Sequence, residues 1–199
     1  LRYIWSHPAN RNRRVRAISR AVGWQIEKRL FRRARDIRVF DGMTLRCYPD
    51  SPSASAMIYC HDSPDFHEMN FIRRYLRAGD TFLDIGANIG VYSLLAASRV
   101  GPSGRVVAFE PAKQASKRLH ENISINQLKN VKVHACALGD REGIVEFLDQ
   151  RDTMNRMITP ADEGGSRISV PVARLDDMVT FKCAMGKMDI EGAEPLAFR

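Results

Sequence analysis

The chain has 199 residues, of which 44% are hydrophobic, and a formal net charge of +8 at pH 7. This length and apolar content suit one globular domain with a packed core and leave no room for a second catalytic domain. No run of eighteen apolar residues indicates a transmembrane helix, and no charged-then-apolar start indicates a secretory signal, so we expect a cytoplasmic protein.

The cysteines are scattered along the chain without Cys-x-x-Cys spacing. This pattern favours neither a zinc site nor a disulfide framework, so we expect reduced, mostly buried thiols. The four residues are Cys47, Cys60, Cys136 and Cys183.

Positive charge gathers at the N-terminal end of the chain. The first 38 residues hold eleven Arg and one Lys against Glu27 and Asp36, a net +10, so the remaining residues sum to −2. Apolar residues recur in this segment at intervals of three and four: Val15, Ile18, Val22, Ile26 and Leu30. This spacing predicts a basic amphipathic helix with one apolar stripe.

Such a helix can dock on its own, more acidic domain, lie on an anionic membrane surface or contact nucleic acid. Docking is the favoured alternative and nucleic acid the least favoured, because amphipathic helices usually bury their apolar face inside the protein. We interpret Trp5 and Trp24 as packing residues rather than as interfacial anchors.

A small β element and a helix follow. Residues 37–40 and 43–48 flank Asp41-Gly42, which is typical of a two-residue hairpin turn. Ser63-Pro64 is a suitable N-cap and first turn for a helix that Gly79 ends. We therefore predict an extension over residues 1–62, made of the basic helix and a β-hairpin, and a main domain over residues 63–199.

The main domain alternates between strand and helix patterns. Such alternation predicts an α/β fold of the Rossmann-like, doubly wound type with a mostly parallel sheet. The expected strands are 81–85, 105–110, 130–136 and 184–189, and the expected helices are 90–100 and 112–126. Two further strands, 144–148 and 168–172, are expected to form a hairpin insertion around a Gly-rich loop at 162–165.

A nucleoside site is predicted where the first two strands of this domain end. Gly86 and Gly90 can adopt positive φ and let backbone N–H groups approach a ligand. Asp84 ends its strand in the crevice where open α/β sheets bind ligands. Glu110, at the tip of the next strand, is placed to accept hydrogen bonds from both ribose hydroxyls.

The residue type at position 88 distinguishes between nucleoside cofactors. A dinucleotide fingerprint has glycine where this chain has Asn88, and a side chain there would crowd a pyrophosphate. An acid at position 84 repels phosphates but attracts the amino group and the sulfonium of S-adenosylmethionine. We therefore predict S-adenosylmethionine as the cofactor, with Asn88 among the residues that bind it, and a nicotinamide-dependent oxidoreductase as the alternative. Cys136 and Ala137 are small enough to leave room for adenine, or they simply pack.

Three acids, Asp189, Glu191 and Glu194, cluster after the last expected strand. One of them can act as a general base, the cluster can hold a divalent cation, or it can orient an acceptor through its hydroxyls. We favour orientation of the acceptor by all three, with Asp189 or Glu191 as the base. No metal site is predicted, since no histidine accompanies the carboxylates. Capping of the following helix is the structural alternative.

Four motifs in this order and spacing resemble the FkbM-type methyltransferases, over roughly Phe66 to Arg199. They are Asp84-Ile85-Gly86-Ala87-Asn88-Ile89-Gly90, Phe109-Glu110-Pro111, Val172-Ala173-Arg174-Leu175-Asp176-Asp177 and Lys187-Met188-Asp189-Ile190-Glu191-Gly192-Ala193-Glu194. The resemblance implies an S-adenosylmethionine-binding sheet and methyl transfer to a small-molecule or glycan acceptor, usually at an oxygen of a sugar, lipid or secondary metabolite. It also implies that Glu68 can reach the amino group of the donor, although an acid early in a helix is favoured there in any case.

The resemblance also bears on the ends of the chain. The family's sheet normally has three further strands beyond Arg199, and the chain opens on Leu1, so we expect a domain truncated at its C-terminus. The remaining alternative is a noncatalytic Rossmann-like module whose basic helix binds a membrane or nucleic acid.

Overall fold

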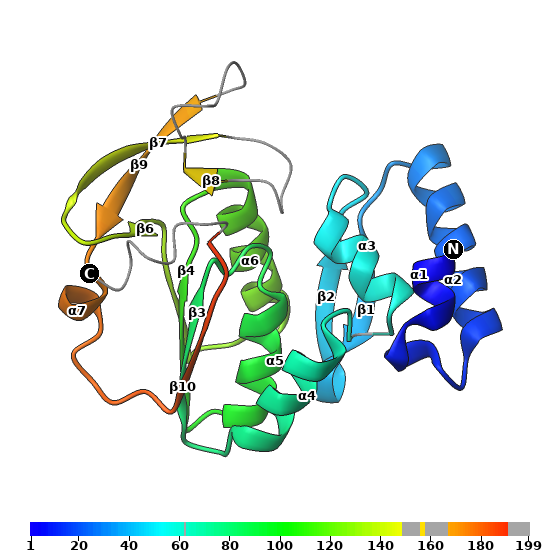
Figure 1. Cartoon of the computed structure of the whole chain (residues 1–199), viewed down its shortest axis with the longest axis horizontal. Coiled ribbons are helices and arrows are strands. Elements are labelled where there is room, and N and C mark those ends of the chain that lie inside the picture. Colours follow the sequence, from blue (N-terminus) through cyan, green and yellow to red (C-terminus); the bar gives the residue numbers. More distant parts are fainter. Residues whose placement is uncertain (62, 149–155, 158–166, 191–199) are drawn as a thin grey trace. The chain divides into compact units, whose positions relative to one another are not determined.

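The computed structural model describes residues 1–61, 63–148, 156–157 and 167–190. The chain separates into two compact units, an N-terminal unit of Leu1–Tyr75 and a C-terminal unit of Leu76–Arg199. Figure 1 names their helices and strands. The boundary predicted between residues 62 and 63 stays a prediction.

The N-terminal unit combines four α-helices with a two-stranded sheet. Its elements are α1 (Arg2–Ser6), the 3-10 turn η1 (Pro8–Asn10), α2 (Arg14–Leu30), β1 (Arg35–Val39), the 3-10 turn η2 (Phe40–Gly42), β2 (Met43–Cys47), α3 (Pro52–Tyr59) and α4 (Phe66–Tyr75). The fully buried Asn10 side chain donates hydrogen bonds to the carbonyls of Ile4 and Tyr59, at 3.0 and 2.9 Å. These bonds tie α1 to the end of α3.

Helix α2 forms where the basic helix was predicted, but the face that it buries is different. Ala17, Ala21 and Trp24 are buried, and the Trp24 Nε1–H donates to Ser55 Oγ on α3 at 3.0 Å. Two alanines one turn apart let the backbones of α2 and α3 come close, and the indole fills the space beside them. The packed face therefore consists of small residues and one aromatic ring.

The apolar residues that carried the helix prediction lie mainly on the outside. Val15 and Leu30 are each 70% exposed, Ile26 is 51% exposed and Val22 is 46% exposed. Ile18, partly buried, packs against the cluster that contains Ala17. Spacing alone indicated the wrong face for packing within this unit, because it counts branched apolar residues and gives little weight to alanine.

The predicted hairpin is confirmed, with a longer turn than expected. Strands β1 and β2 pair antiparallel with Val39 opposite Met43, so three residues connect them rather than two. The additional residue is Phe40, whose side chain is only 3% exposed, and Asp41 takes the left-handed φ of 53°. Burial of the phenyl ring explains why Phe40 belongs to the turn.

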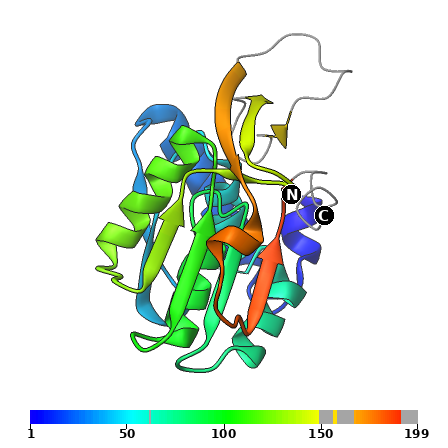
Figure 2. The same ribbon diagram turned by 90° about the vertical axis from the view of Figure 1, so that its left-hand side faces the viewer.

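The C-terminal unit contains the predicted parallel sheet. Its strands are β3 (Thr81–Ile85), β4 (Arg105–Phe109), β5 (Val131–His134) and β10 (Met185–Met188), in the order β10-β3-β4-β5 with every neighbouring pair parallel. Figure 2 shows these strands side by side. The strand order reverses between β3 and β10, and open sheets of this type bind ligands at such a reversal. The α/β fold class is confirmed.

Both faces of this sheet are covered. Helices α5 (Val91–Val100) and α6 (Lys113–Ile125) lie on one face, and α7 (Leu175–Met178) lies on the other (Figure 1). Leu83 and Phe109 pack toward the α7 side, whereas Ala108 packs against Leu119 of α6. Covered faces explain why β3 and β4 are almost continuously apolar.

A second sheet forms from the predicted insertion. It consists of β6 (Ala137–Leu138), β7 (Gly143–Leu148), β8 (Arg156–Met157) and β9 (Arg167–Ala173), in the order β6-β9-β7-β8. Strands β7 and β9 pair antiparallel, which confirms the hairpin. The Gly-rich loop at 162–165 lies outside the described residues.

The cysteines and the length of the helices can be compared with the sequence predictions over the described residues. The four cysteines are free thiols, three of them buried and Cys183 exposed, as predicted. Burial raises the pKa of the Cys47 thiol to about 12. Within the part of the chain that the structure describes, no helix has both the length and the apolar character that crossing a bilayer requires.

Replacing Trp24 with Ala is expected to destabilise the protein by about 3–5 kcal/mol, because a fully buried indole leaves a cavity and Ser55 loses its donor. Urea unfolding measures this change. The matched control is Trp5→Ala, at a tryptophan that is 47% exposed, which should cost less than about 1 kcal/mol. Equal losses in the two variants would contradict the assignment of the packed face.

Candidate cofactor and active site

The glycine loop after β3 is closely packed between neighbouring elements. Gly86 has a φ of 77°, and a Cβ atom there would lie 1.9 Å from the carbonyl oxygen of Asp189. Gly90 has a φ of 91°, and its Cβ would lie 2.5 Å from Leu119 Cδ1 on α6. The predicted positive φ values are confirmed, and the reason is close approach to β10 and α6 as well as backbone conformation.

Glu110 connects this loop to the loop after β4. One carboxylate oxygen accepts the Asn88 backbone N–H at 2.7 Å, and the other accepts the Ala112 N–H at 2.8 Å. Asn88 itself has a left-handed φ of 53°, and its side-chain oxygen accepts the Ile89 N–H at 2.6 Å. Asparagine tolerates this conformation well, so position 88 has a structural role in addition to the cofactor contact predicted for it.

These backbone contacts are compatible with the ribose role predicted for Glu110. A carboxylate has about four acceptor positions in total, so it can serve backbone N–H groups and hydroxyls together. The side chain is almost fully buried, with only 6% exposed. Charge-assisted hydrogen bonds in such a site are stronger than those in water.

Asp84 is a fully buried acid at the carboxyl end of β3. Ser93 Oγ on α5 donates to its Oδ2 at 2.5 Å, whereas Oδ1 has no hydrogen-bond partner among the described residues. Burial raises the pKa of Asp84, and the positive charge of Lys187 and the hydrogen bonds from Ser93 lower it by less. A buried carboxylate with an unsatisfied oxygen favours a ligand that brings positive charge or a donor.

Lys187 is a site residue to which the sequence analysis assigned no role. It lies on β10 directly opposite Asp84 in the parallel register. Its ammonium nitrogen is 3.3 Å from the Gly86 carbonyl oxygen, 3.4 Å from Asp189 Oδ2 and 5.0 Å from the centre of the Tyr92 ring. One signal in the sequence could have identified Lys187. It lies within a strand expected to be buried, and a buried lysine needs partners of opposite charge or hydrogen-bond acceptors.

The predicted acids after β10 are placed only in part. Asp189 lies beside Gly86, and its N–H donates to the Ile85 carbonyl at 3.0 Å. Its side chain is 63% exposed. Glu191 and Glu194 lie outside the described residues, so their roles stay predictions. Glu68 is an exposed residue of α4 in the N-terminal unit, and its contact with the donor also stays a prediction.

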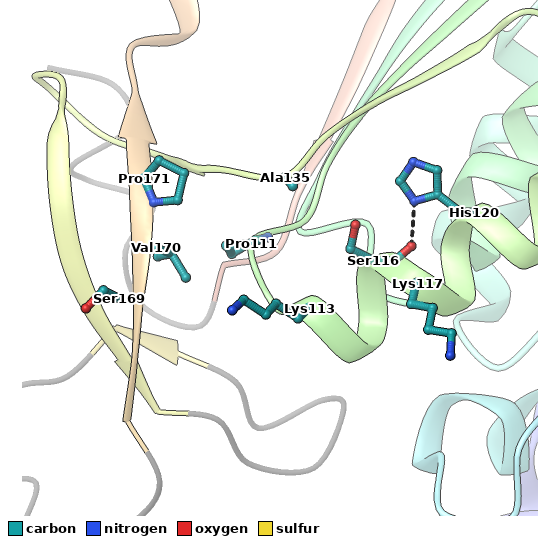
Figure 3. Close-up of a pocket in the computed structure, with 9 residues that line it drawn as sticks. All are labelled: Pro111, Lys113, Ser116, Lys117, His120, Ala135, Ser169, Val170 and Pro171. Atoms are coloured by element: carbon teal, nitrogen blue, oxygen red, sulfur yellow. Dashed lines mark hydrogen bonds between the residues drawn. The ribbon is translucent and has the colours of Figure 1, made fainter.

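Of the small residues after β5, Ala135 lines the pocket described below, whereas the predicted adenine contacts Cys136 and Ala137 pack in the core. Cys136 and Ala137 are buried in two hydrophobic clusters, at 8% and 7% exposure. Ala135 and Pro111, the residue that follows Glu110 in the sequence, instead line a pocket of about 310 Å³ between the start of α6 and β9 (Figure 3). The adenine role of Cys136 and Ala137 stays a prediction.

Comparison with known proteins identifies this arrangement. Residues 84–199 match the family model of the methyltransferase FkbM domain. The chain belongs to this methyltransferase family. The matched region begins at Asp84 and includes the glycine loop, Glu110 and Lys187, which lie at the carboxyl ends of β3, β4 and β10.

Two curated relatives share parts of this sequence. The AMB antimetabolite synthetase AmbE of Pseudomonas aeruginosa is 36% identical over 105 residues, which are 43% of this chain and 5% of that protein. Methyltransferase 1 of Beauveria bassiana is 24% identical over 163 residues, 68% of this chain and 59% of that protein. The chain thus spans less than two thirds of either relative.

A solved structure is also similar in part. The SAM-dependent O-methyltransferase of Thermotoga maritima is 27% identical, with a TM-score of 0.33, over 35% of this chain and 28% of that one.

S-adenosylmethionine is the methyl donor of this FkbM domain, and the crevice fits it. Asp84 has a buried carboxyl oxygen without a hydrogen-bond partner among the described residues, which suits the cationic end of the donor. Glu110 offers a carboxylate to the ribose, and the bare backbone at Gly86 and Gly90 allows a ligand to come close.

Replacing Gly86 with Ala is expected to weaken S-adenosylmethionine binding at least tenfold, because the added methyl group forces the loop away from Asp189. Isothermal titration measures the change. The control is Gly23→Ala in α2, where a Cβ atom meets nothing within 4 Å. It should leave donor affinity unchanged, and an equal loss there would refute the argument from close approach.

The Asp84→Asn variant is expected to be more stable than the parent at neutral pH, by on the order of 1 kcal/mol, while it binds the donor more weakly. Folding raises the pKa of Asp84, so its ionised form destabilises the folded state. This cost is absent below the ordinary aspartate range and develops as the pH rises through the raised pKa.

Thermal unfolding at several values between about pH 4 and pH 8 measures the difference between the two proteins. The gain in stability should shrink as the pH falls. The exposed Asp140 provides the control, since Asp140→Asn should change the stability by less than about 0.5 kcal/mol. A stability gain of Asp84→Asn that grows as the pH falls would contradict the raised pKa of Asp84.

Proposed function

We propose that this FkbM domain transfers a methyl group from S-adenosylmethionine to a hydroxyl oxygen of a sugar, a lipid or a secondary metabolite. The observation that carries the proposal is the position of Asp189, whose backbone carbonyl lies against Gly86 of the glycine loop and whose carboxylate is exposed beside Lys187. When bound, S-adenosylmethionine supplies an electrophilic methyl group on a sulfonium.

The acidic residues that the structure describes fall into a donor group and an acceptor group. Asp84 and Glu110 are buried and serve the donor, whereas Asp189 is accessible to an acceptor. The acceptor oxygen forms the new bond to carbon as the carbon–sulfur bond breaks, and sulfur keeps the electron pair. The hydroxyl proton passes to Asp189 or, in the same role, to Glu191.

Lys187 positions the base rather than reacting. Its ammonium group contacts both Asp189 and the carbonyl of Gly86, so the base is linked to the same loop that lines the donor crevice. Holding the acceptor and the donor in one geometry supplies much of the acceleration in such a transfer. Glu194 is proposed to contribute a hydrogen bond to the acceptor.

Two features support methyl transfer over the nicotinamide alternative. The turn at Asn88 carries a side chain whose oxygen accepts the Ile89 N–H, where a pyrophosphate needs open backbone. The family match covers the crevice itself. The proposal places the reaction in the cytoplasm, where free thiols such as Cys47 and Cys60 stay reduced.

Asp189→Asn is expected to leave the dissociation constant for S-adenosylmethionine within about threefold, while it slows methyl transfer by about 10²–10⁴-fold. Glu110→Gln should instead weaken donor binding by about tenfold or more, since a charge-assisted hydrogen bond is lost. Isothermal titration measures binding. Release of S-adenosylhomocysteine with a panel of hydroxylated sugars, lipids and metabolites measures transfer.

The matched control for Asp189→Asn is Asp176→Asn, at an acid in α7 whose side chain is 88% exposed. It should change neither quantity. Equal loss of binding and transfer in Asp189→Asn would refute the acceptor-side role of Asp189. Methylation of nitrogen instead of oxygen across the panel would refute the proposed acceptor class.

A further inference from the structure

We propose that the N-terminal unit binds an anionic lipid surface through the outer face of α2. The surface consists of an apolar stripe with arginines beside it. We call Val15, Val22, Ile26 and Leu30 the outer stripe. The inference concerns a different unit from the proposed active site and stands independently of the acceptor.

The outer stripe is a true second face of α2. Its residues follow one another at intervals of seven, four and four, which places them on one side of an α-helix. The opposite side buries Ala17, Ala21 and Trp24, so the packing of α2 within its unit is already complete. Val15 and Leu30 at 70% exposure, with Ile26 at 51%, form an apolar strip longer than scattered surface residues would give.

Positive charge borders the stripe. Arg14, Arg16 and Arg29 are exposed on α2, and Arg32 and Arg33 are exposed just after it. Within the described chain, Arg16, Arg29, Arg32 and Arg33 form no ion pair with a carboxylate. The first 38 residues carry a net +10. These guanidinium groups are therefore available for an anionic partner.

One aromatic side chain lies beside these arginines. Trp5 of α1 is 47% exposed, and the guanidinium carbon of Arg14 lies 5.3 Å from the centre of its ring. Tryptophan beside arginine is the combination that anchors helices at the level of lipid headgroups.

Lipid is the partner that satisfies both parts of this surface. A helix in the plane of the membrane buries its apolar face at the headgroup boundary and pairs its arginines with lipid phosphates. Nucleic acid would use the arginines but not the aliphatic stripe. A second copy of the chain would place its own N-terminal segment, with a net charge of +10, against the same charge, and the two would repel. The remaining residues of this chain have a net charge of only −2, so they attract the arginines weakly. The negatively charged cytoplasmic leaflet matches it.

Flotation with vesicles tests the proposal on the whole chain. Binding is expected to phosphatidylcholine vesicles that contain about one third phosphatidylserine, and much less to pure phosphatidylcholine. The double variant Val22→Asp/Ile26→Asp should lower the partition coefficient at least tenfold. Arg16→Gln/Arg29→Gln should lower it about fivefold per arginine removed.

Ile144→Asp is the matched control, because it makes the same change at a residue of β7 that is 76% exposed. It should bind vesicles as the parent does. Thermal unfolding should show that the Asp variants of α2 stay folded. A second test leaves the outer stripe intact. In the Trp24→Phe variant Trp5 is the one remaining tryptophan, and its fluorescence emission should shift to the blue when anionic vesicles are added.

Several results would overturn the proposal. They are failure of the parent to float with anionic vesicles at low salt, unchanged binding by the Val22→Asp/Ile26→Asp variant, or an unshifted Trp5 emission. A change from dimer to monomer in that variant, without vesicle binding by the parent, would assign the stripe to a second copy of the chain. Tighter binding to DNA than to vesicles would assign the arginines to nucleic acid.

Discussion

The donor crevice depends on one carboxylate, that of Glu110, which holds two loops together through their backbones. The loop after β3 is attached through Asn88 and the loop after β4 through Ala112. Bonds from an ionised group to backbone N–H groups are strong and fix the chain without relying on mobile side chains. With the loops held in this way, Gly86 can keep its close approach to Asp189. A loop fixed through its backbone costs little entropy to order when a ligand binds.

Burial distinguishes Asp84 of β3 from Asp189, which directly follows the neighbouring strand β10. Asp84 has no exposed surface and a raised pKa, and Asp189 is largely exposed. Lys187 extends from the strand position opposite Asp84 and pairs with Asp189, so charges alternate at the point where the strand order reverses. The buried acid costs stability that a cationic ligand offsets, while the exposed acid remains open to a second substrate. The proposed donor and acceptor sides of the crevice therefore meet where β10 ends.

Helix α2 illustrates how packing and hydrophobicity can favour different faces. Close contact between α2 and α3 requires small residues, and Ala17 and Ala21 supply them around Trp24. Larger aliphatic residues were left for the outside, where they meet exposed arginines. A helix with two apolar faces is unusual for a surface element, because an apolar stripe in water contributes nothing to folding. The outer stripe is therefore better explained by a binding partner than by the folding of the N-terminal unit.

The sequence by itself determined the alternation of strands and helices from β3 to β5, the parallel sheet, and the placement of Asp84, Gly86 and Glu110 where β3 and β4 end. These features follow from local periodicity and from where a strand ends, both of which are encoded in neighbouring residues. The buried face of α2, the inclusion of Phe40 in its turn and the position of Lys187 between two acids were decided only by the tertiary structure. Each depends on which distant element comes into contact, and side-chain volume and charge compensation across elements leave no periodic signal in the sequence.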